Sequence, residues 1–214
     1  MMFRDRREAG EKLAGKLGDY KGRKDALVIA LPRGGVVTGF EIARRLDLPL
    51  DIIIIRKIGF PGQPEFAIGA VSETGEVLLN RSVINSYGVD EGYIREEVER
   101  QKEIIRRRKD LYRGGRGLSG LEGKTAILVD DGVATGSTAK AAIAALKKAG
   151  PKEIVLGLPV APPRTAEELK AMVDRFICLH TDPYFLAVGN YYSDFEQVTD
   201  EEVAVILQKY VPAK

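Results

Sequence analysis

The sequence of 214 residues contains one cysteine, one histidine and no tryptophan. Because Cys178 is the only thiol, no disulfide can form within the chain. The chain is charged from Arg4 onward, unlike a secretory signal, and its longest apolar stretches, such as residues 50–55, are too short to cross a bilayer. These absences argue against a disulfide-stapled or membrane-spanning protein and predict a soluble protein of the reducing cytoplasm.

A strong charge of either sign is also missing. Lys and Arg number 33 against 31 Asp and Glu, which gives a net charge of +2. The overall field therefore favours neither nucleic acid nor an acidic membrane as a partner. The length fits a single domain over residues 1–214 with a substantial core, and we expect an inserted hairpin and charged helix at about 66–120.

Short apolar runs alternate with segments of helical spacing along most of the chain. We predict strands at residues 26–31, 50–56, 125–129, 154–160 and 175–179. We predict helices at residues 3–17, 36–46, 138–149, 163–172 and 200–210. This alternation predicts an α/β fold with a doubly wound, mostly parallel sheet, whose ligands bind beyond the carboxyl ends of the strands.

The insertion has a different pattern. Residues 59–64 are rich in Gly and Pro and predict a loop, and two alternating segments around residues 73–76 predict a hairpin that ends near Leu79. Residues 90–113 then carry a thin apolar stripe among dense mixed charge, which predicts a long, largely exposed helix. Its role stays open between a lid, a dimer surface and a partner site.

The most informative segment follows the strand at 125–129. Asp130 and Asp131 come directly after it, and the segment Thr135–Thr138 opens a helix. Amides at a helix N-terminus, together with hydroxyls, suit a terminal phosphate, and Gly136 lets the backbone approach it. Two carboxylates repel phosphate but can accept hydrogen bonds from a vicinal diol. An ordinary strand end and helix cap would explain one acid and one hydroxyl, so the segment predicts a ribose 5-phosphate site.

Four apolar residues, two acids and a Thr-Gly-x-Thr ending resemble the phosphoribosyl-pyrophosphate motif of type I phosphoribosyltransferases. It is neither a Walker loop nor a dinucleotide fingerprint. The G-x-G-x-x-G pattern at residues 115–120 follows a charged helix instead of a strand, and we interpret it as a linker. The resemblance covers roughly two-thirds of the chain. It implies the fold of that family, including a small C-terminal hood.

Two further segments extend the resemblance. The first strand is followed by Arg33, Gly34 and Gly35. The glycines expose backbone amides and Arg33 supplies a planar guanidinium group, both of which can bind a diphosphate. They are similar to the family's pyrophosphate loop, where a cis peptide bond often occurs. Arg56 and Lys57, with the Pro-Gly loop after them, look like the corresponding stretch of adenine phosphoribosyltransferases and are assigned to the phosphates. Solvated surface charge is the alternative for this pair.

The C-terminal segment is dense in aromatic residues and loosely resembles the hood of purine phosphoribosyltransferases. There an aromatic ring stacks on the base and an acid helps to hold metal, which would fall to Phe185 or Tyr191 and to Asp194. Core packing explains these aromatics equally well. His180 and Cys178 make a poor metal site and are interpreted as structural.

The resemblance implies transfer of phosphoribose from phosphoribosyl pyrophosphate to a nitrogenous base or amine, with Mg²⁺ and release of pyrophosphate. Asp130, Asp131 and Lys57 are the expected catalytic residues, and the two aspartates would meet the metal indirectly, through the ribose hydroxyls. We also expect a homodimer. The expected substrate-binding residues are Arg33, Gly34, Gly35, Arg56, Lys57, Asp130, Asp131, Ala134, Thr135, Gly136, Ser137, Thr138, Phe185 and Tyr191.

Two features limit this prediction. Ala134 stands where hypoxanthine-guanine enzymes carry an aspartate, which argues against a 6-oxopurine and leaves the acceptor open. A regulator that senses phosphoribosyl pyrophosphate and acts on nucleic acid is the alternative, because residues 106–109 are all basic. Glutamates on the same helix favour a salt-bridged face instead. A phosphatase or hydrolase lacks support, since the sequence has no nucleophile elbow or metal cluster.

Overall fold

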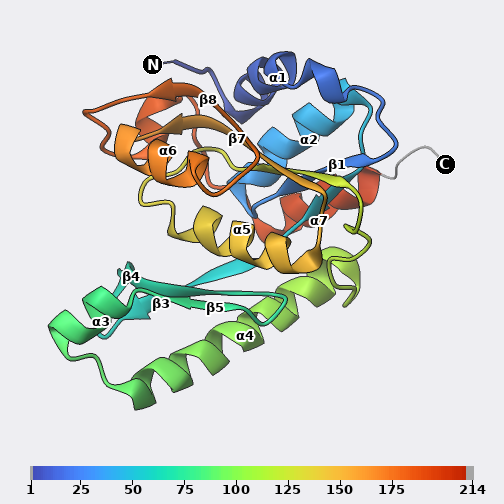
Figure 1. Ribbon diagram of the computed structural model, residues 1–214. Helices are drawn as coiled ribbons and strands as arrows, with labels where there is room; N and C mark the ends of the chain where they lie inside the picture. Colours follow the sequence, from blue (N-terminus) through green and yellow to red (C-terminus); the bar gives the residue numbers. More distant parts are fainter. Residues whose placement is uncertain (1, 211–214) are drawn as a thin grey trace.

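The computed structural model describes residues 2–210, and its centre is a five-stranded parallel sheet in the order β2-β1-β6-β7-β8 (Figure 1). These strands are β1 (Ala26–Ala30), β2 (Leu50–Ile52), β6 (Thr125–Val129), β7 (Glu153–Ala161) and β8 (Arg175–Thr181). The strand order reverses between β1 and β6, which are hydrogen-bonded neighbours. The predicted parallel, doubly wound sheet is confirmed, and its switch point lies where ligands bind in such folds.

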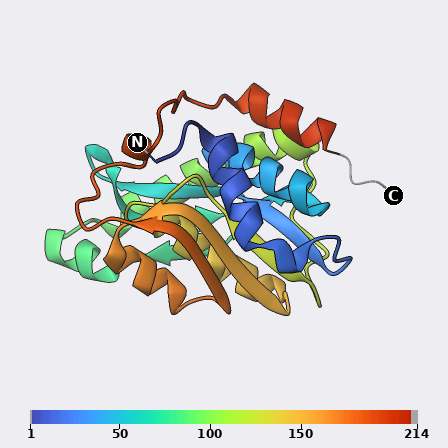
Figure 2. The same cartoon turned by 90° about the horizontal axis from the view of Figure 1, so that it is seen from above.

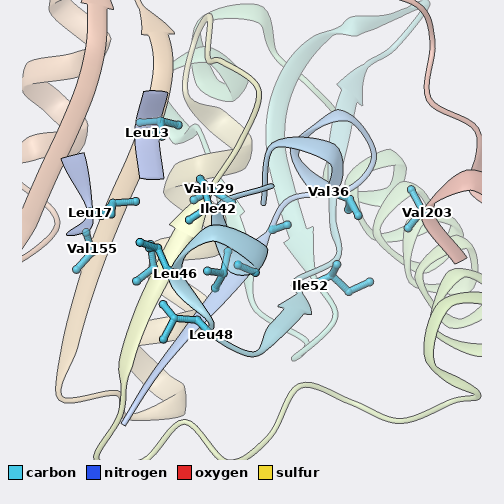
Figure 3. Packing of buried hydrophobic residues seen from close by; sticks show 14 of the residues in the cluster. Leu13, Leu17, Val36, Ile42, Leu46, Leu48, Ile52, Val129, Val155 and Val203 are labelled. Atoms are coloured by element: carbon cyan, nitrogen blue, oxygen red, sulfur yellow. The ribbon is translucent and has the colours of Figure 1, made fainter. Parts of the chain in front are cut away.

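Helices cover both faces of this sheet. Helices α1 (Arg6–Lys16) and α2 (Gly34–Leu46) lie on one face, while α5 (Ser137–Ala149) and α6 (Pro163–Lys170) lie on the other. Within β1, Val28 joins the cluster that contains α1 and α2, and Ile29 joins the cluster of α5. Figure 3 shows side chains of the first cluster between the helices and the sheet. Burial on both faces explains why these strands are apolar throughout.

A second sheet and a long helix form an arm, residues 55–113, beside this core. Its antiparallel strands are β3 (Ile55–Phe60), β4 (Gln63–Ser72) and β5 (Val77–Leu79), followed by α3 (Arg81–Tyr87) and α4 (Glu91–Arg113). The predicted hairpin and long helix are confirmed, and the apolar stripe of α4 is buried. The last helix, α7 (Asp200–Lys209), packs on α2 and on α4 (Figure 2).

Two predictions around the arm are wrong, and one helix was missed. The run at 50–56 is two strands in two sheets, because the chain leaves the parallel sheet at Ile53 and Ile54. The Glu73 carboxylate accepts a hydrogen bond from the Ile54 amide at 3.0 Å and so holds this break. The loop at 59–64 is mostly strand around a tight turn at Pro61 and Gly62. Helix α3 was not predicted, since its seven residues are too short for a clear helical period.

The C-terminal segment 182–198, the hood, crosses the edge of the sheet where the strands end. It contains a short 3₁₀ helix, Val188–Tyr191, and pairs through Tyr192 with Phe3 near the N-terminus. A second 3₁₀ helix, Gly18–Tyr20, follows α1. Within residues 2–210, no helix combines the length and apolarity needed to cross a bilayer.

Candidate functional site

The start of α2 lies directly against the acidic pair at the end of β6. A Cβ atom built on Gly34 would lie 1.8 Å from Asp131 Oδ2, and one built on Gly35 would lie 2.9 Å from Asp130 Oδ1. Any side chain at Gly34 would therefore displace a carboxylate. The two glycines expected at the pyrophosphate and the two acids expected at the ribose are brought together, as the strand order requires.

Burial and mutual repulsion govern the acidic pair. Both aspartates are partly buried, and Asp130 Oδ1 accepts a hydrogen bond from the Asp131 amide at 2.9 Å. Burial, reinforced by the neighbouring carboxylate, raises the pKa of Asp130 well above its ordinary value. Burial also raises the pKa of Asp131, although Arg6 opposes that rise. Perturbed carboxyl groups of this kind are concentrated at functional sites.

Arg6 is a residue of this site that sequence reasoning missed. Its Nε donates to Asp131 Oδ2 at 2.6 Å, its Nη1 donates to the Glu196 carbonyl at 2.8 Å, and its guanidinium lies 3.8 Å from the centre of the Phe195 ring. Only 11% of the Arg6 side chain and 14% of the Asp131 side chain are exposed. Arg6 thus ties α1 and the hood to the acidic pair. Because 125 positions separate the partners, no local pattern could have found them.

The predicted phosphate end of the site lies at the start of α5. Gly136 is the N-cap, with φ of 72°, and no side chain caps the first amides of the helix. A Cβ on Gly136 would meet Thr165 Cγ2 at 2.8 Å, so both conformation and space require glycine there. The hydroxyls of Thr135 and Ser137 lie 3.1 Å apart, and Ala134 and Thr135 are exposed. The predicted hydroxyls thus lie beside uncapped amides, an arrangement that suits an anion.

The predicted basic residues are arranged less simply. Arg33 is the N-cap of α2, and the peptide bond between Pro32 and Arg33 is cis, as the family resemblance implied. Arg56 is partly buried on β3, and its Nε donates to Gln101 Oε1 at 2.8 Å. Lys57 is exposed, and successive strand side chains point to opposite faces. Arg56 and Lys57 therefore do not lie on one face of the strand.

The predicted aromatic residues of the hood pack on each other. The Phe185 and Tyr191 rings are stacked, with centroids 5.4 Å apart. Tyr191 is buried, and its hydroxyl donates to Asp182 Oδ2 at 2.6 Å. Phe185 is only partly buried. The hood touches the acidic pair through Tyr192, whose hydroxyl donates to the Asp131 carbonyl at 2.5 Å.

The possible metal ligands do not form a protein cage. Among residues 2–210, His, Cys, Asp and Glu side chains form no group of three that could hold a metal ion. The exposed Asp194 accepts from the Glu196 amide at 3.2 Å and makes no hydrogen bond or ion pair to the acidic pair. Cys178 Sγ donates to the His180 carbonyl at 3.1 Å, and burial raises the pKa of the thiol to about 11, which fits a structural role.

The comparisons with known proteins agree with this geometry. A family model described as phosphoribosyl transferase domain matches residues 5–194. The chain is 40% identical over 209 residues to two curated Mycobacterium tuberculosis proteins, from strains CDC 1551 / Oshkosh and ATCC 25618 / H37Rv, both provisionally named phosphoribosyl transferases. The match covers 97% of this chain and 47% of those proteins, so the chain spans about half the length of the curated relatives it matches. The chain belongs to the phosphoribosyl transferase domain family.

Solved structures provide a second comparison. The crystal structure of TT1426 from Thermus thermophilus is 44% identical in sequence and superposes with a TM-score of 0.81. The superposition covers 98% of this chain and 99% of that one, so the arm and the hood are included. A purine phosphoribosyltransferase from Pyrococcus horikoshii Ot3 is more distant, with 22% identity and a TM-score of 0.45 over 79% of this chain and 80% of that chain.

Proposed function

We propose that this protein transfers phosphoribose from phosphoribosyl pyrophosphate to a nitrogenous base or amine and releases pyrophosphate. The observation that carries the proposal is the contact between the glycine loop and the acidic pair, beside the uncapped start of α5. A ligand with a diphosphate, a vicinal diol and a terminal phosphate matches these three features in that arrangement.

The chain's own residues would act by holding the ligand and by stabilising charge. Asp130 and Asp131 accept hydrogen bonds from the ribose hydroxyls, and their charge stabilises the positive sugar ring as the bond to pyrophosphate loosens. Gly34, Gly35 and Arg33 hold the departing pyrophosphate, and Arg56 offsets its charge. The catalytic role of Lys57, whose side chain points to the opposite face of β3 from Arg56, stays a prediction. The segment Ala134–Thr138 holds the 5-phosphate. No side chain need act as a nucleophile.

Magnesium fits this site as an ion that binds together with the phosphates of the substrate. Mg²⁺ keeps several waters and binds mainly through substrate phosphates, so the lack of a protein cage among residues 2–210 is no obstacle. Asp130 and Asp131 would hold it indirectly, through the ribose hydroxyls. When bound, it would neutralise charge on the pyrophosphate. The roles of Phe185 and Tyr191 in stacking on the acceptor, and of Asp194 near the metal, stay predictions. So do the homodimer and the cytoplasmic location.

The test is calorimetric titration of the protein with phosphoribosyl pyrophosphate and Mg²⁺. The double variant Asp130→Asn/Asp131→Asn should lose binding by at least about tenfold, because each carboxylate accepts charge-assisted hydrogen bonds from the ribose. The matched control is Asp19→Asn, at an exposed carboxylate paired with Arg175.

Two outcomes bear on the proposal as a whole. No binding to the wild-type protein, or equal binding to the double variant, would contradict the proposed site. Binding without pyrophosphate release, for any base or amine supplied, would favour the sensing regulator instead. Arg106 and Arg107 pair with Glu103 on their own helix, which leaves that alternative without a free basic face at these two positions.

A further inference from the structure

Residues of three separate elements meet around the carboxylate of Asp200, in the first turn of α7. Asp200 Oδ1 lies 3.5 Å from Arg108 Nη2 of α4 and 4.0 Å from Arg33 Nη1 of the pyrophosphate loop. Tyr112, one turn further along α4, donates its hydroxyl to the same oxygen. The arm is thereby attached, through a single acid, to the loop expected to hold pyrophosphate.

The charges in this cluster do not balance. Arg56 of β3 is close enough for Arg108 to lower its pKa by repulsion, in addition to the larger effect of burial. Arg33 and Arg108 therefore share the Asp200 carboxylate, while Arg56 lies near both Asp200 and Glu97. All three are at least partly buried, and only 17% of the Arg108 side chain is exposed. Partly buried charges without a counter-charge are costly, so a cluster of this kind is suited to receive an anion.

The position of Arg108 in the helical repeat of α4 places its side chain at this cluster. Gln101, Ile105, Arg108 and Tyr112 follow the helical repeat and share the face that packs against the rest of the protein. The neighbouring Arg106 and Arg107 lie on the other side, exposed and paired with Glu103. Arg108 thus differs from Arg106 and Arg107 by its position on the helix alone, since all three carry the same side chain.

We propose that Arg108 of the arm is a pyrophosphate-binding residue, and that the Asp200 carboxylate is the counter-ion that occupies Arg108 and Arg33 until the ligand takes its place. This inference rests on the proposed function and deepens it. The free protein uses the Asp200 carboxylate as a substitute anion. When a diphosphate enters, both guanidiniums turn to its oxygens, and the bidentate fork of arginine suits that exchange. The arm would then be part of the substrate site.

The experiment compares Arg108→Gln with Arg107→Gln, a matched change at the next residue of the same helix. Each protein is titrated with inorganic pyrophosphate and Mg²⁺, with phosphoribosyl pyrophosphate and Mg²⁺, and with ribose 5-phosphate. We expect Arg108→Gln to weaken the first two ligands by roughly tenfold, the loss of about one charge-assisted hydrogen bond, and to leave ribose 5-phosphate unchanged. Arg107→Gln should match the wild-type protein throughout. Thermal unfolding of each variant verifies that it is folded.

The variant Asp200→Asn distinguishes two roles of Asp200: a carboxylate that stands in for the anionic ligand, and a residue that only stabilises the structure. Asparagine keeps a hydrogen-bond acceptor for Tyr112 but removes the competing charge, so pyrophosphate should bind as tightly as before or more tightly. Weakening by Asp200→Asn to the same extent as by Arg108→Gln would overturn the role of Asp200. A wild-type Kd for pyrophosphate in Arg108→Gln would overturn the role of Arg108 alone. A wild-type protein that binds neither pyrophosphate nor phosphoribosyl pyrophosphate would overturn this inference and the proposed function together.

Discussion

Asp130 carries an electrostatic cost in the ligand-free protein. Burial and the adjacent carboxylate both disfavour its charged form, and its own hydrogen bond from the Asp131 amide offsets only part of this. Such a cost is tolerated where function requires it, because stability and activity often oppose each other at one position. The ribose hydroxyls would supply the hydrogen bonds that the free protein lacks.

This cost predicts that Asp130→Asn stabilises the ligand-free protein at neutral pH. A carboxyl whose pKa is higher in the folded than in the unfolded chain destabilises the folded state once it is ionised. The gain in free energy of unfolding should be about 1 kcal/mol, a usual size for such exchanges. It should be fully present above the raised folded pKa and vanish as the pH falls to the ordinary value of 3.8.

Denaturant unfolding of both proteins at several pH values measures that difference. Because asparagine can accept the same hydrogen bond from the Asp131 amide, the comparison isolates the charge. A variant that is less stable than the wild type at pH 7, or a gain that grows as the pH falls, would contradict the assignment of a raised pKa to Asp130. A stable variant also ensures that lost ligand binding is not lost folding.

Site residues that belong to short, continuous sequence motifs could be predicted from the sequence. Gly34, Asp130 and Asp131 belong to short segments in which neighbouring residues together indicate the ligand. The structure brings these segments into contact. Arg6 and Asp200 could not be found in this way. Their ion pairs join residues far apart in sequence, and a single arginine or aspartate in a charged helix carries no local signal.

At the scale of elements, the regular core was predictable and the arm only in part. The strands of the parallel sheet are buried on both faces, which makes them continuous apolar runs that are easily recognised. The same property hid the boundary between β2 and β3, because Ile53 and Ile54 are as buried as the strands beside them. The break depends on the hydrogen bond from the Ile54 amide to the Glu73 carboxylate. The hydrophobic periodicity of the sequence gives no sign of such a tertiary contact.

The close approach of α2 to the end of β6 predicts the effect of Gly34→Ala. A methyl group there would collide with Asp131 Oδ2 at 1.8 Å and with Arg6 Nε at 2.8 Å, so the acidic pair or Arg6 must move. We expect a loss of about 1–3 kcal/mol in stability, the usual cost of overpacking. Binding of phosphoribosyl pyrophosphate should also fall, by at least about tenfold, because the displaced groups are those that hold ribose and pyrophosphate.

The control is Gly15→Ala in α1, where nothing lies within 4 Å of an added Cβ. Alanine is the better helix former, so this variant should gain roughly 0.5–1 kcal/mol and bind as the wild type does. Thermal unfolding and calorimetry on the two variants provide the comparison. If Gly34→Ala binds the ligand with wild-type affinity, the loop and the acidic pair do not form one site.

At the scale of the whole molecule, the arrangement of the hydrophobic cores decides which parts can unfold independently. The parallel sheet has a large core on each face, while the outer part of the arm has its own small cluster built from Ile58, Ile68, Ile84, Val89, Ile94 and Val98. The inner part of the arm joins the main cores through Ile55, Ala70 and Ile105. The outer arm can therefore open locally while the sheet and the acidic pair stay folded.

Hydrogen exchange on two matched isoleucine variants tests this division. Ile94→Ala in the arm and Ile143→Ala in α5 both truncate a buried side chain, so each should cost about 2–5 kcal/mol where it acts. Ile94→Ala should speed amide exchange in β3, β4 and the first half of α4 and leave the parallel sheet protected. Ile143→Ala should speed exchange across the whole protein, because it lowers the stability of the main core. If Ile94→Ala lowers protection of β1 and β6 equally, the arm and the sheet unfold as one cooperative unit, and the division into separate cores is wrong.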